Sequence, residues 1–215
     1  MSKGGKKISV VDYGVGNLRS LLRAFDYFDA GAILTEEAKD IESSDALVLP
    51  GDGAFAAGMN GVEVRKLKSA ILNFAASGRP ILGICLGAQI LMSEGFEFGR
   101  FKGLNLIPGR VVKFSKLAQN EKIPQIGWNG IIPSKEGSKQ ILLNDVKPGD
   151  NVYFVHSYII MPDKSSDILA YTSYGGVKYC SVVGNGNIFG VQFHPEKSGK
   201  VGLRIIKNFI KIIHA

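Results

Sequence analysis

The chain has 215 residues, of which 45% are hydrophobic and 21% are charged, a length and composition typical of one domain with a sizeable buried core. No stretch approaches the roughly 20 apolar residues of a membrane helix, and residues 1–7 contain no apolar signal core, so we expect no membrane and a cytoplasmic location. The net charge of +7 admits nucleic acid as a partner, but the bases are scattered and no zinc-finger spacing or RNP motif is present. We therefore expect no nucleic acid, although a nucleic-acid binder remains a minor alternative.

The first half of the chain alternates strand-like runs with helical patterns. Residues 8–12 form an apolar run, and Asn17 precedes a segment with helical spacing and is the expected helix cap. Further strands are expected at residues 46–49 and 80–84, each followed by a helix, at 62–74 and 86–92. Strands that alternate with helices predict a parallel sheet with right-handed crossovers.

The second half is richer in short β-branched and aromatic runs, at residues 110–114, 151–155, 168–173, 177–183 and 188–193. Glycine turns at 174–176 and 184–187 predict hairpins between the last three runs. A closing helix at 201–213 is apolar almost all round, which predicts burial on more than one side. We therefore expect a single α/β domain over residues 1–215, with a mostly parallel sheet flanked by helices and an antiparallel portion in the second half.

One of the two cysteines lies in a pattern that favours catalysis. Both Cys85 and Cys180 are expected to be free thiols, because two cysteines are too few for a disulfide scaffold. Cys85 stands between a strand and a helix in Gly83-Ile84-Cys85-Leu86-Gly87, and glycines at these positions permit the tight turn of a nucleophile elbow. The N–H of Leu86 could then donate to an oxyanion. A lone cysteine is more often a core residue, but this spacing favours the catalytic interpretation.

A thiol nucleophile needs a base, and the sequence has three histidines. His214 is the penultimate residue and is expected to be exposed, and His156 ends an apolar run. Only His194 has a carboxylate two residues later, at Glu196, so both side chains can project to one side of an extended segment. A Cys85–His194–Glu196 triad is therefore the preferred hypothesis.

These residues resemble the class I, or triad, glutamine amidotransferases, whose G-x-C-x-G-x-Q elbow and F-H-P-E segment stand here at 83–89 and 193–196. Within that flavodoxin-like family the chain is similar to the glutaminase subunits of imidazole glycerol phosphate synthase. The matching stretches are 12–18, 103–109, 126–129, 154–158 and 192–199, which together span nearly the whole chain.

The resemblance implies a reaction and a set of site residues. Cys85 would attack the amide of glutamine to form a thioester, His194 would transfer the proton, and Glu196 would orient His194. The oxyanion hole would come from Leu86, Asp52 and Gly53, and the loop that contains Asp52 would rest in an inactive setting. Glutamine would be bound by Gly51, Gln89, Glu97, Ser157 and Tyr158. No metal and no cofactor are expected.

Two positions depart from the family pattern. We would expect an apolar residue, typically valine, in place of Asp52, and methionine in place of Ala88. A carboxylate near a developing oxyanion would oppose it, so we expect the side chain of Asp52 to point to solvent.

The resemblance also implies a partner, a (β/α)8 cyclase subunit that would receive the ammonia and make imidazole glycerol phosphate and aminoimidazole carboxamide ribotide in histidine biosynthesis. We expect the interface at Trp128, Asn129, Tyr153 and Asn17, although a core role for Trp128 and Tyr153 is an equal alternative. Two further alternatives stay open: a paralogous glutaminase that supplies a surface-sugar amidotransferase, and a catalytically silent scaffold subunit.

Overall fold

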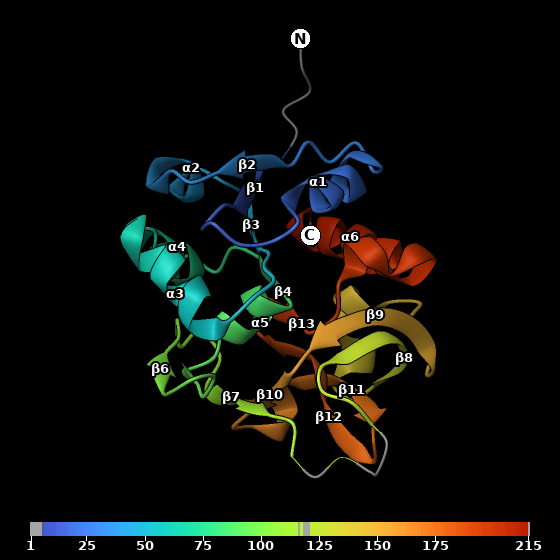
Figure 1. The fold of residues 1–215 in the computed structure, drawn as a ribbon. Coiled ribbons are helices and arrows are strands. Elements are labelled where there is room, and N and C mark those ends of the chain that lie inside the picture. Colours follow the sequence, from blue (N-terminus) through green and yellow to red (C-terminus); the bar gives the residue numbers. More distant parts are fainter. Residues whose placement is uncertain (1–5, 116, 118–120, 215) are drawn as a thin grey trace.

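The computed structural model describes residues 6–115, 117 and 121–214 (Figure 1). The first half contains β1 (Ile8–Val11), α1 (Leu18–Asp26), β2 (Ile33–Thr35), α2 (Ala38–Glu42), β3 (Ala46–Leu49), α3 (Phe55–Val64), α4 (Lys68–Ala76), β4 (Ile81–Ile84) and α5 (Leu86–Ile90). The second half contains β5 (Glu94–Gly95), β6 (Phe101–Lys102), β7 (Gly109–Lys113), β8 (Gln125–Pro133), β9 (Asp150–His156), β10 (Tyr158–Pro162), β11 (Ile168–Tyr174), β12 (Val177–Asn185), β13 (Ile188–Val191) and α6 (Gly199–Ile213). Short 3-10 turns lie at Gly137–Lys139, Ile141–Leu143, Ser165–Asp167 and Pro195–Lys197.

One mixed sheet runs through the molecule in the order β2-β1-β3-β4-β13-β12-β10-β7-β5-β6. Neighbours from β2 to β13 pair in parallel, whereas β13 with β12, β12 with β10 and β10 with β7 pair antiparallel. β11 pairs with β12 and β8, and β8 pairs with β9. The expected α/β fold, with a mostly parallel sheet flanked by helices and an antiparallel portion in the second half, is confirmed.

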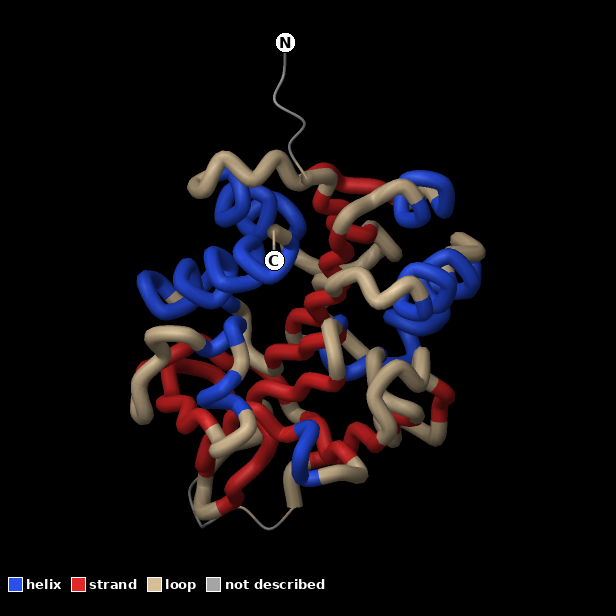
Figure 2. The backbone as a smooth tube through the Cα atoms, turned by 180° about the vertical axis from the view of Figure 1, so that it is seen from behind, coloured by secondary structure: helices blue, strands red, loops and turns tan. Residues whose placement is uncertain are grey.

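Helices cover both faces of the parallel strands, with α1 and α6 on one side and α3 and α4 on the other (Figures 1 and 2). Because alternate residues of a strand point to opposite faces, Val10 joins the core under α1 and α6 while Val11 joins the core under α3, α4 and α5. Strands buried on both faces need no polar alternation. This burial explains why β3 and β4 have no charged or polar side chain and why β1 has only one, the buried Ser9.

The carboxyl ends of β1, β3, β4 and β13 meet at one edge of the sheet, because these strands run in parallel. The segments that follow them are residues 12–17, the loop 50–54, Cys85 and residues 192–196. Crevices at this edge are the usual ligand site of open α/β sheets. The topology therefore gathers every segment that carries a predicted catalytic residue.

Both predicted hairpins are confirmed. Tyr174 pairs with Val177, and Asn185 pairs with Ile188, so each turn has two central residues. Gly175 and Gly176 both have positive φ, at 54° and 79°. A two-residue turn that matches the twist of the strands requires this conformation.

Two expectations about helices were wrong, and a third was right only in part. The single helix predicted at 62–74 is two helices, α3 and α4, separated where Lys66 adopts a φ of 56°. Asn17 is the N-cap residue of α1, as expected, but its side chain makes no cap hydrogen bond. The closing helix α6 is buried on one side only, because Lys207 and Lys211 are exposed while Ile206 and Phe209 are buried.

Several elements were not predicted, namely the short β2, α2, β5, β6 and β10 and the nine-residue strand β8. His214 is exposed, as expected. The domain bounds of 1–215 stay a prediction, and the expectation about a signal core falls largely on residues 1–5, outside the described part. No helix among the described residues is long and apolar enough to cross a membrane.

Candidate active site

Cys85 lies at a sharp turn between β4 and α5, with φ of 52° and ψ of −108°. Such a positive φ is strained for a residue with a side chain and persists only where the surroundings hold it. Here the N–H of Cys85 donates to the carbonyl of Val191 at 2.8 Å. The flanking glycines are required by packing, since a Cβ on Gly83 would lie 2.7 Å from the backbone N of Ala88, and one on Gly87 would meet the carbonyl of Leu49. The nucleophile elbow is therefore built by contacts with β3 and β13.

His194 and Glu196 form a buried pair immediately after β13. Nδ1 of His194 lies 2.8 Å from Oε1 of Glu196, and each side chain is 5% exposed. The backbone N–H of His194 donates to the carbonyl of Tyr153 at 3.0 Å, which ties this segment to β9. Nε2 of His194 and Oε2 of Glu196 are buried without a hydrogen-bond partner among the described residues. The arrangement holds Nδ1 on the carboxylate and leaves Nε2 for proton transfer.

The protonation of His194 depends on both of its neighbours. Burial lowers the pKa of His194, but Cys85 and the carboxylate of Glu196 raise it more strongly, and the resulting pKa is about 10. An imidazolium is therefore favoured where it can stabilise a thiolate at Cys85. The fold brings together the three members of the expected triad from two distant segments: Cys85 follows β4, and the His194–Glu196 pair follows β13.

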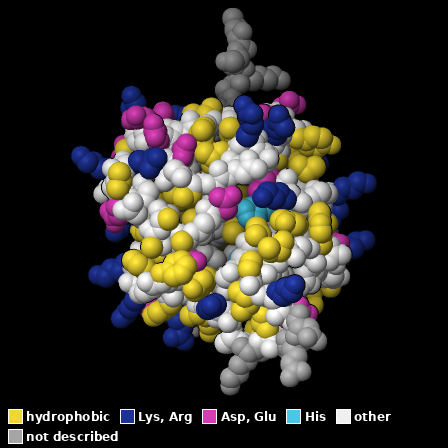
Figure 3. Space-filling model, in the orientation of Figure 1, with side chains coloured by type: hydrophobic (Ala, Val, Ile, Leu, Met, Phe, Trp, Pro, Cys, Tyr) yellow, Lys and Arg dark blue, Asp and Glu magenta, His cyan; other side chains and the backbone are white. Residues whose placement is uncertain are grey.

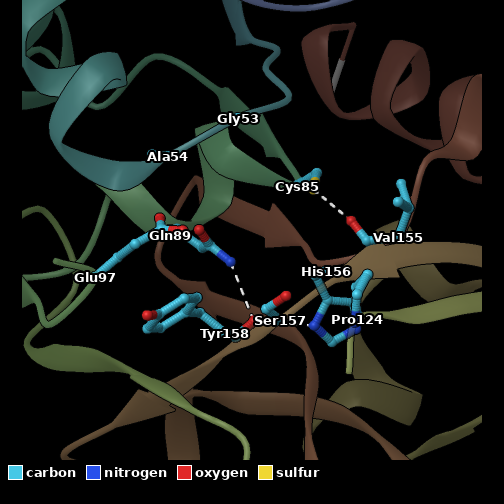
Figure 4. Close-up of a pocket in the computed structure, with 10 residues that line it drawn as sticks. All are labelled: Gly53, Ala54, Cys85, Gln89, Glu97, Pro124, Val155, His156, Ser157 and Tyr158. Atoms are coloured by element: carbon cyan, nitrogen blue, oxygen red, sulfur yellow. Dashed lines mark hydrogen bonds between the residues drawn. The ribbon is translucent and has the colours of Figure 1, made fainter. Parts of the chain in front are cut away.

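A pocket of about 310 Å³ opens beside Cys85 (Figure 4). Figure 4 shows Cys85 at one end, Glu97 at the other, and Gln89 and Tyr158 between them. The full lining is Gly53, Ala54, Cys85, Gln89, Glu97, Pro124, Val155, His156, Ser157 and Tyr158. A free amino acid fits a pocket of this volume that has a thiol at one end and a carboxylate at the other.

The polar groups of the pocket are held by the protein. Oε2 of Glu97 accepts the N–H of Phe55 at 2.8 Å, which leaves Oε1 for a cation. Nε2 of Gln89 donates to the carbonyl of Tyr158 at 3.2 Å and to Oε1 of Gln192 at 3.3 Å. The amide oxygen of Gln89 is then the part of that side chain that a substrate can contact. Of the five residues expected to bind glutamine, Gln89, Glu97, Ser157 and Tyr158 line the pocket, and Gly51 is not among the lining residues.

The loop expected to supply the oxyanion hole adopts a different arrangement. The N–H of Leu86 donates to the carbonyl of Gly51 at 3.3 Å, so this donor is not directed at a substrate. Gly53 has a φ of 114° and lines the pocket, while the side chain of Asp52 is exposed. The hydroxyl of Tyr13 donates to the carbonyl of Pro50. The N–H of Leu86, expected to serve an oxyanion hole, is therefore occupied within the chain in this state, and the loop is held by Tyr13 on one side and by Leu86 on the other.

Sequence reasoning missed four lining residues, Ala54, Pro124, Val155 and His156, and the buried Gln192 behind them. His156 is 6% exposed; its Nδ1 lies 2.9 Å from the carbonyl of Tyr158 and its Nε2 lies 3.3 Å from the hydroxyl of Tyr179. Chiefly because of burial, the pKa of His156 is lowered to about 4, so this ring is neutral at neutral pH. The sequence signal that could have found His156 is its position two residues before Tyr158, a residue already expected to bind glutamine, because alternate residues of an extended segment share a side.

The residues expected at a partner interface lie near the catalytic segment. Trp128 is 57% exposed and faces Tyr153 across the β8–β9 ladder, with ring centroids 6.1 Å apart. Nζ of Lys197 lies 6.0 Å from the ring of Tyr153. Asn17 is exposed, whereas Asn129 uses its amide to bind the carbonyl of Ser173 at 2.9 Å. Trp128 is therefore not a core residue, and Asn129 has a structural role within the chain.

The space-filling view shows the face of the molecule that is turned to the reader in Figure 1 (Figure 3). A small area of histidine surface lies near its centre, bordered by acidic and basic side chains on one side and by hydrophobic side chains on the other. Exposed hydrophobic residues on β8 include Ile126 and Trp128, at 62% and 57%. An exposed aromatic and aliphatic pair of this kind fits the apolar core of a protein–protein interface, with the charged side chains at its rim.

Comparison with known proteins places this geometry in a family. Residues 9–213 match the family described as Glutamine amidotransferase class-I. The chain is 47% identical to imidazole glycerol phosphate synthase subunit HisH 1 of Legionella pneumophila strain Paris, covering 95% of this chain and 99% of that protein. It is 41% identical to subunit HisH of Chlorobaculum tepidum, covering 94% and 98%.

Solved structures agree on the fold. A glutamine amidotransferase superposes with a TM-score of 0.72 at 15% identity, covering 96% of this chain and 99% of the other. The PurLQS complex of Thermotoga maritima contains a chain with a TM-score of 0.70 at 19% identity, covering 96% and 98%. At these identities the likeness concerns the fold.

Proposed function

The chain belongs to the class-I glutamine amidotransferases, in the branch of the HisH subunits of imidazole glycerol phosphate synthase, and from this premise we propose that it is the glutaminase of that enzyme. The substrate is glutamine and the products are glutamate and ammonia. One observation supports the proposal above the others: a buried His194–Glu196 pair stands beside a cysteine on a nucleophile elbow that opens into an amino-acid-sized pocket.

In the first step, Sγ of Cys85 attacks the side-chain carbonyl carbon of glutamine. His194 takes the thiol proton on Nε2 and passes it to the leaving nitrogen, so ammonia departs and a γ-glutamyl thioester remains. Glu196 holds Nδ1 and stabilises the imidazolium that forms. The pKa of His194, raised to about 10, is consistent with a base that holds its proton while the thiolate attacks.

In the second step, a water attacks the thioester, and His194 accepts one of its protons. The carbon–sulfur bond breaks, Cys85 recovers a proton, and glutamate leaves. The free oxygen of Glu97 is placed to bind the ammonium group of the substrate, and the amide oxygen of Gln89 is placed to bind one of its N–H groups. The backbone of Ser157 and Tyr158 is proposed to bind the α-carboxylate.

The state of the oxyanion loop makes this activity conditional. While the carbonyl of Gly51 accepts the N–H of Leu86, the negative charge of a tetrahedral intermediate has no donor there. We propose that the loop of Asp52 and Gly53 rotates when the partner is bound and occupied, so that backbone N–H groups of the loop and of Leu86 face the substrate. Ammonia is then released only when an acceptor is ready. In these terms the partner shifts the population of the loop from the resting to the active conformation.

The proposed partner is the cyclase subunit, which uses the ammonia to form imidazole glycerol phosphate and aminoimidazole carboxamide ribotide in histidine biosynthesis. We place the interface at Trp128, Tyr153 and Asn17, beside the catalytic segment. The names of the relatives support this acceptor over a surface-sugar amidotransferase. The complete constellation of Cys85, His194 and Glu196 argues against a silent scaffold. A cytoplasmic location fits the two free, buried cysteines.

The test is an assay of glutamate release by the chain alone, with the cyclase subunit, and with the cyclase subunit and its ribotide. We expect release to rise strongly in the third mixture and to disappear in Cys85→Ala. The Cys85→Ala complex should still make product from added ammonium salt, because the cyclase is intact. Equal glutamate release by wild type and Cys85→Ala would refute the proposal.

A further inference from the structure

Gln192 is a fully buried amide, 0% exposed, at the junction between β13 and the catalytic segment. Its backbone N–H donates to the carbonyl of Ser181 at 2.9 Å, which extends the β12–β13 ladder by one residue. Phe193 points into the core under α1 and α6. Because alternate residues of an extended segment share a side, Gln192 and His194 both face the elbow that carries Cys85.

The amide of Gln192 joins the nucleophile to the substrate pocket through a short chain of hydrogen bonds. Nε2 of Gln192 lies 3.8 Å from Sγ of Cys85, within hydrogen-bond distance for sulfur. Its Oε1 accepts from Nε2 of Gln89 at 3.3 Å, and the same Nε2 donates to the carbonyl of Tyr158 at 3.2 Å. The chain therefore runs from the pocket wall at Tyr158 to the sulfur of Cys85.

The direction of this chain is fixed at one end by a backbone carbonyl. The carbonyl of Tyr158 can only accept, so Gln89 must present its NH2 group there. The same NH2 group faces Gln192, which must then present its oxygen to Gln89. The NH2 group of Gln192 is consequently the part that meets the sulfur.

The NH2 group of Gln192 favours the thiolate form of Cys85 over the thiol form. As a thiol, Cys85 can donate to the carbonyl of Val155, which lies 3.8 Å away (Figure 4). As a thiolate it can only accept, and the Val155 carbonyl then opposes the charge. The NH2 group of Gln192 offers a hydrogen bond to the thiolate, in addition to the imidazolium of His194.

We propose that Gln192 is a positioning residue that holds the sulfur of Cys85 toward the pocket and stabilises its thiolate. The inference rests on the proposed function, since it needs Cys85 to be the nucleophile. This role also explains why Gln192, which does not line the pocket, has its buried amide bonded to Cys85 and to Gln89.

The test compares wild type with Gln192→Met, which keeps the length of the side chain and removes the amide. Alkylation of Cys85 by iodoacetamide is followed from pH 5 to pH 10 by the mass of the Cys85 peptide, because only the thiolate reacts. We expect the midpoint of the rate profile to move up by about one pH unit, roughly the strength of one charge-assisted hydrogen bond. In the complex with the cyclase subunit and its ribotide, kcat should fall about tenfold, with KM changed by less than about twofold.

Asn208→Leu is the matched control, because Asn208 is a buried amide on α6 that donates to the carbonyls of Leu142 and Asn144, away from the pocket. It should lower the thermal midpoint without moving the alkylation profile. If Gln192→Met does not fold, Gln192→Glu keeps the size of the side chain and the oxygen that accepts from Gln89. Its second oxygen replaces the donor, so an upward shift is expected there too.

An unchanged alkylation midpoint in a folded Gln192 variant overturns the inference, even if kcat falls. That outcome is distinct from failure of the proposed function, in which wild type and Cys85→Ala release glutamate equally. Cys180 does not affect the measurement, because alkylation is followed on the Cys85 peptide and burial raises the pKa of Cys180.

Discussion

At the scale of single residues, His156 and His194 are driven to opposite protonation states by their surroundings. Burial dominates at His156 and lowers its pKa to about 4, and the charge of His194 adds to that effect. At His194 the influence of Cys85 and Glu196 exceeds that of burial, and the pKa is about 10. The neutral ring of His156 can therefore serve as a wall of the pocket, while the charged ring of His194 can serve the thiolate.

The buried neutral His156 predicts an acid-sensitive stability. In the unfolded chain its pKa is near 6.5, so between pH 6.5 and pH 4 the unfolded state binds the proton and the folded state does not. The free energy of unfolding therefore falls as the pH falls through this window, by about 2 kcal/mol at pH 5 from this residue. Urea unfolding at pH 7.5 and at pH 5 measures how much free energy of unfolding is lost between the two pH values. This loss should be smaller in His156→Gln than in wild type, by about 2 kcal/mol. His214→Gln, changed at an exposed position, should lose as much as wild type; an equal loss in His156→Gln would contradict the argument.

Asp52 stands where the family pattern favours valine, and its side chain is exposed. Because the carboxylate faces solvent, it is screened by water from a charge that forms at Cys85. We expect Asp52→Val to leave glutaminase kcat/KM of the complex within about tenfold, or roughly 1.4 kcal/mol. A steady-state assay at two salt concentrations checks this, and a change well beyond tenfold in either direction would show that Asp52 itself tunes the site.

At the scale of elements, the loop of residues 50–53 is held between two neighbours that belong to different segments. Tyr13, two residues after β1, donates to the carbonyl of Pro50, and Leu86, at the start of α5, donates to the carbonyl of Gly51. A Cβ on Gly16 would lie 3.1 Å from Cα of Gly51, so residues 13–17 and the loop pack closely. Asn17, at the proposed interface, ends the same segment. A partner that moves this segment can therefore move the loop.

The hydroxyl of Tyr13 predicts a way to release the loop without the partner. Tyr13→Phe removes the hydrogen bond to Pro50 and leaves most of the packing in place. We expect glutamate release by the chain alone to rise several-fold, because a constraint on the resting loop worth about 1 kcal/mol is lost. The measurement is the ratio of glutamate release with and without the cyclase subunit and ribotide, which should fall.

Tyr179→Phe is the control for this prediction, since Tyr179 is another buried tyrosine whose hydroxyl is bonded, to Oε1 of Gln125 at 2.8 Å. Its loss should cost stability without raising unassisted glutamate release. A similar rise in both variants would mean that general loosening, rather than the contact with Pro50, controls the loop.

At the scale of the whole molecule, the catalytic edge of the sheet and the exposed aromatic surface of β8 and β9 lie side by side. Tyr153 connects them, because its carbonyl accepts the N–H of His194 and its ring faces Trp128. Docking of a partner on Trp128 therefore acts on residues in contact with the triad. This proximity suits an enzyme whose product must pass directly to a second active site.

Trp128→Ala should weaken binding of the cyclase subunit at least tenfold, because a half-exposed tryptophan beside a second aromatic ring is a typical interface anchor. Titration calorimetry or analytical ultracentrifugation measures the change. Leu34→Ala removes an apolar side chain that is 44% exposed on β2, the edge strand remote from β8 and β9, and should leave the affinity unchanged. Equal affinities of wild type and Trp128→Ala for the cyclase subunit would show that the interface does not include Trp128.

Much of this organisation was predictable from local patterns. The elbow around Cys85, the pairing of His194 with Glu196, the apolar runs of β1, β3 and β4 and the two glycine hairpins all depend on residues near one another in the chain. Backbone sterics, strand periodicity and turn chemistry act over that range. The break between α3 and α4 was not predictable, since it depends on a positive φ at Lys66 that the helical spacing does not reveal.

By itself, the sequence determined the fold class, through the alternation of strand and helix patterns, and it predicted the nucleophile and the residues proposed to serve it, because each of these stands in a short motif. Only the tertiary structure decided the roles of Gln192, His156 and Tyr13, whose partners Cys85, Tyr179 and Pro50 are distant in the chain. It also decided that Leu86 donates to Gly51 rather than toward the pocket. The physical reason is that a hydrogen bond or a pKa depends on which groups the sheet brings within a few ångströms, and the spacing of residues along the chain does not specify that set.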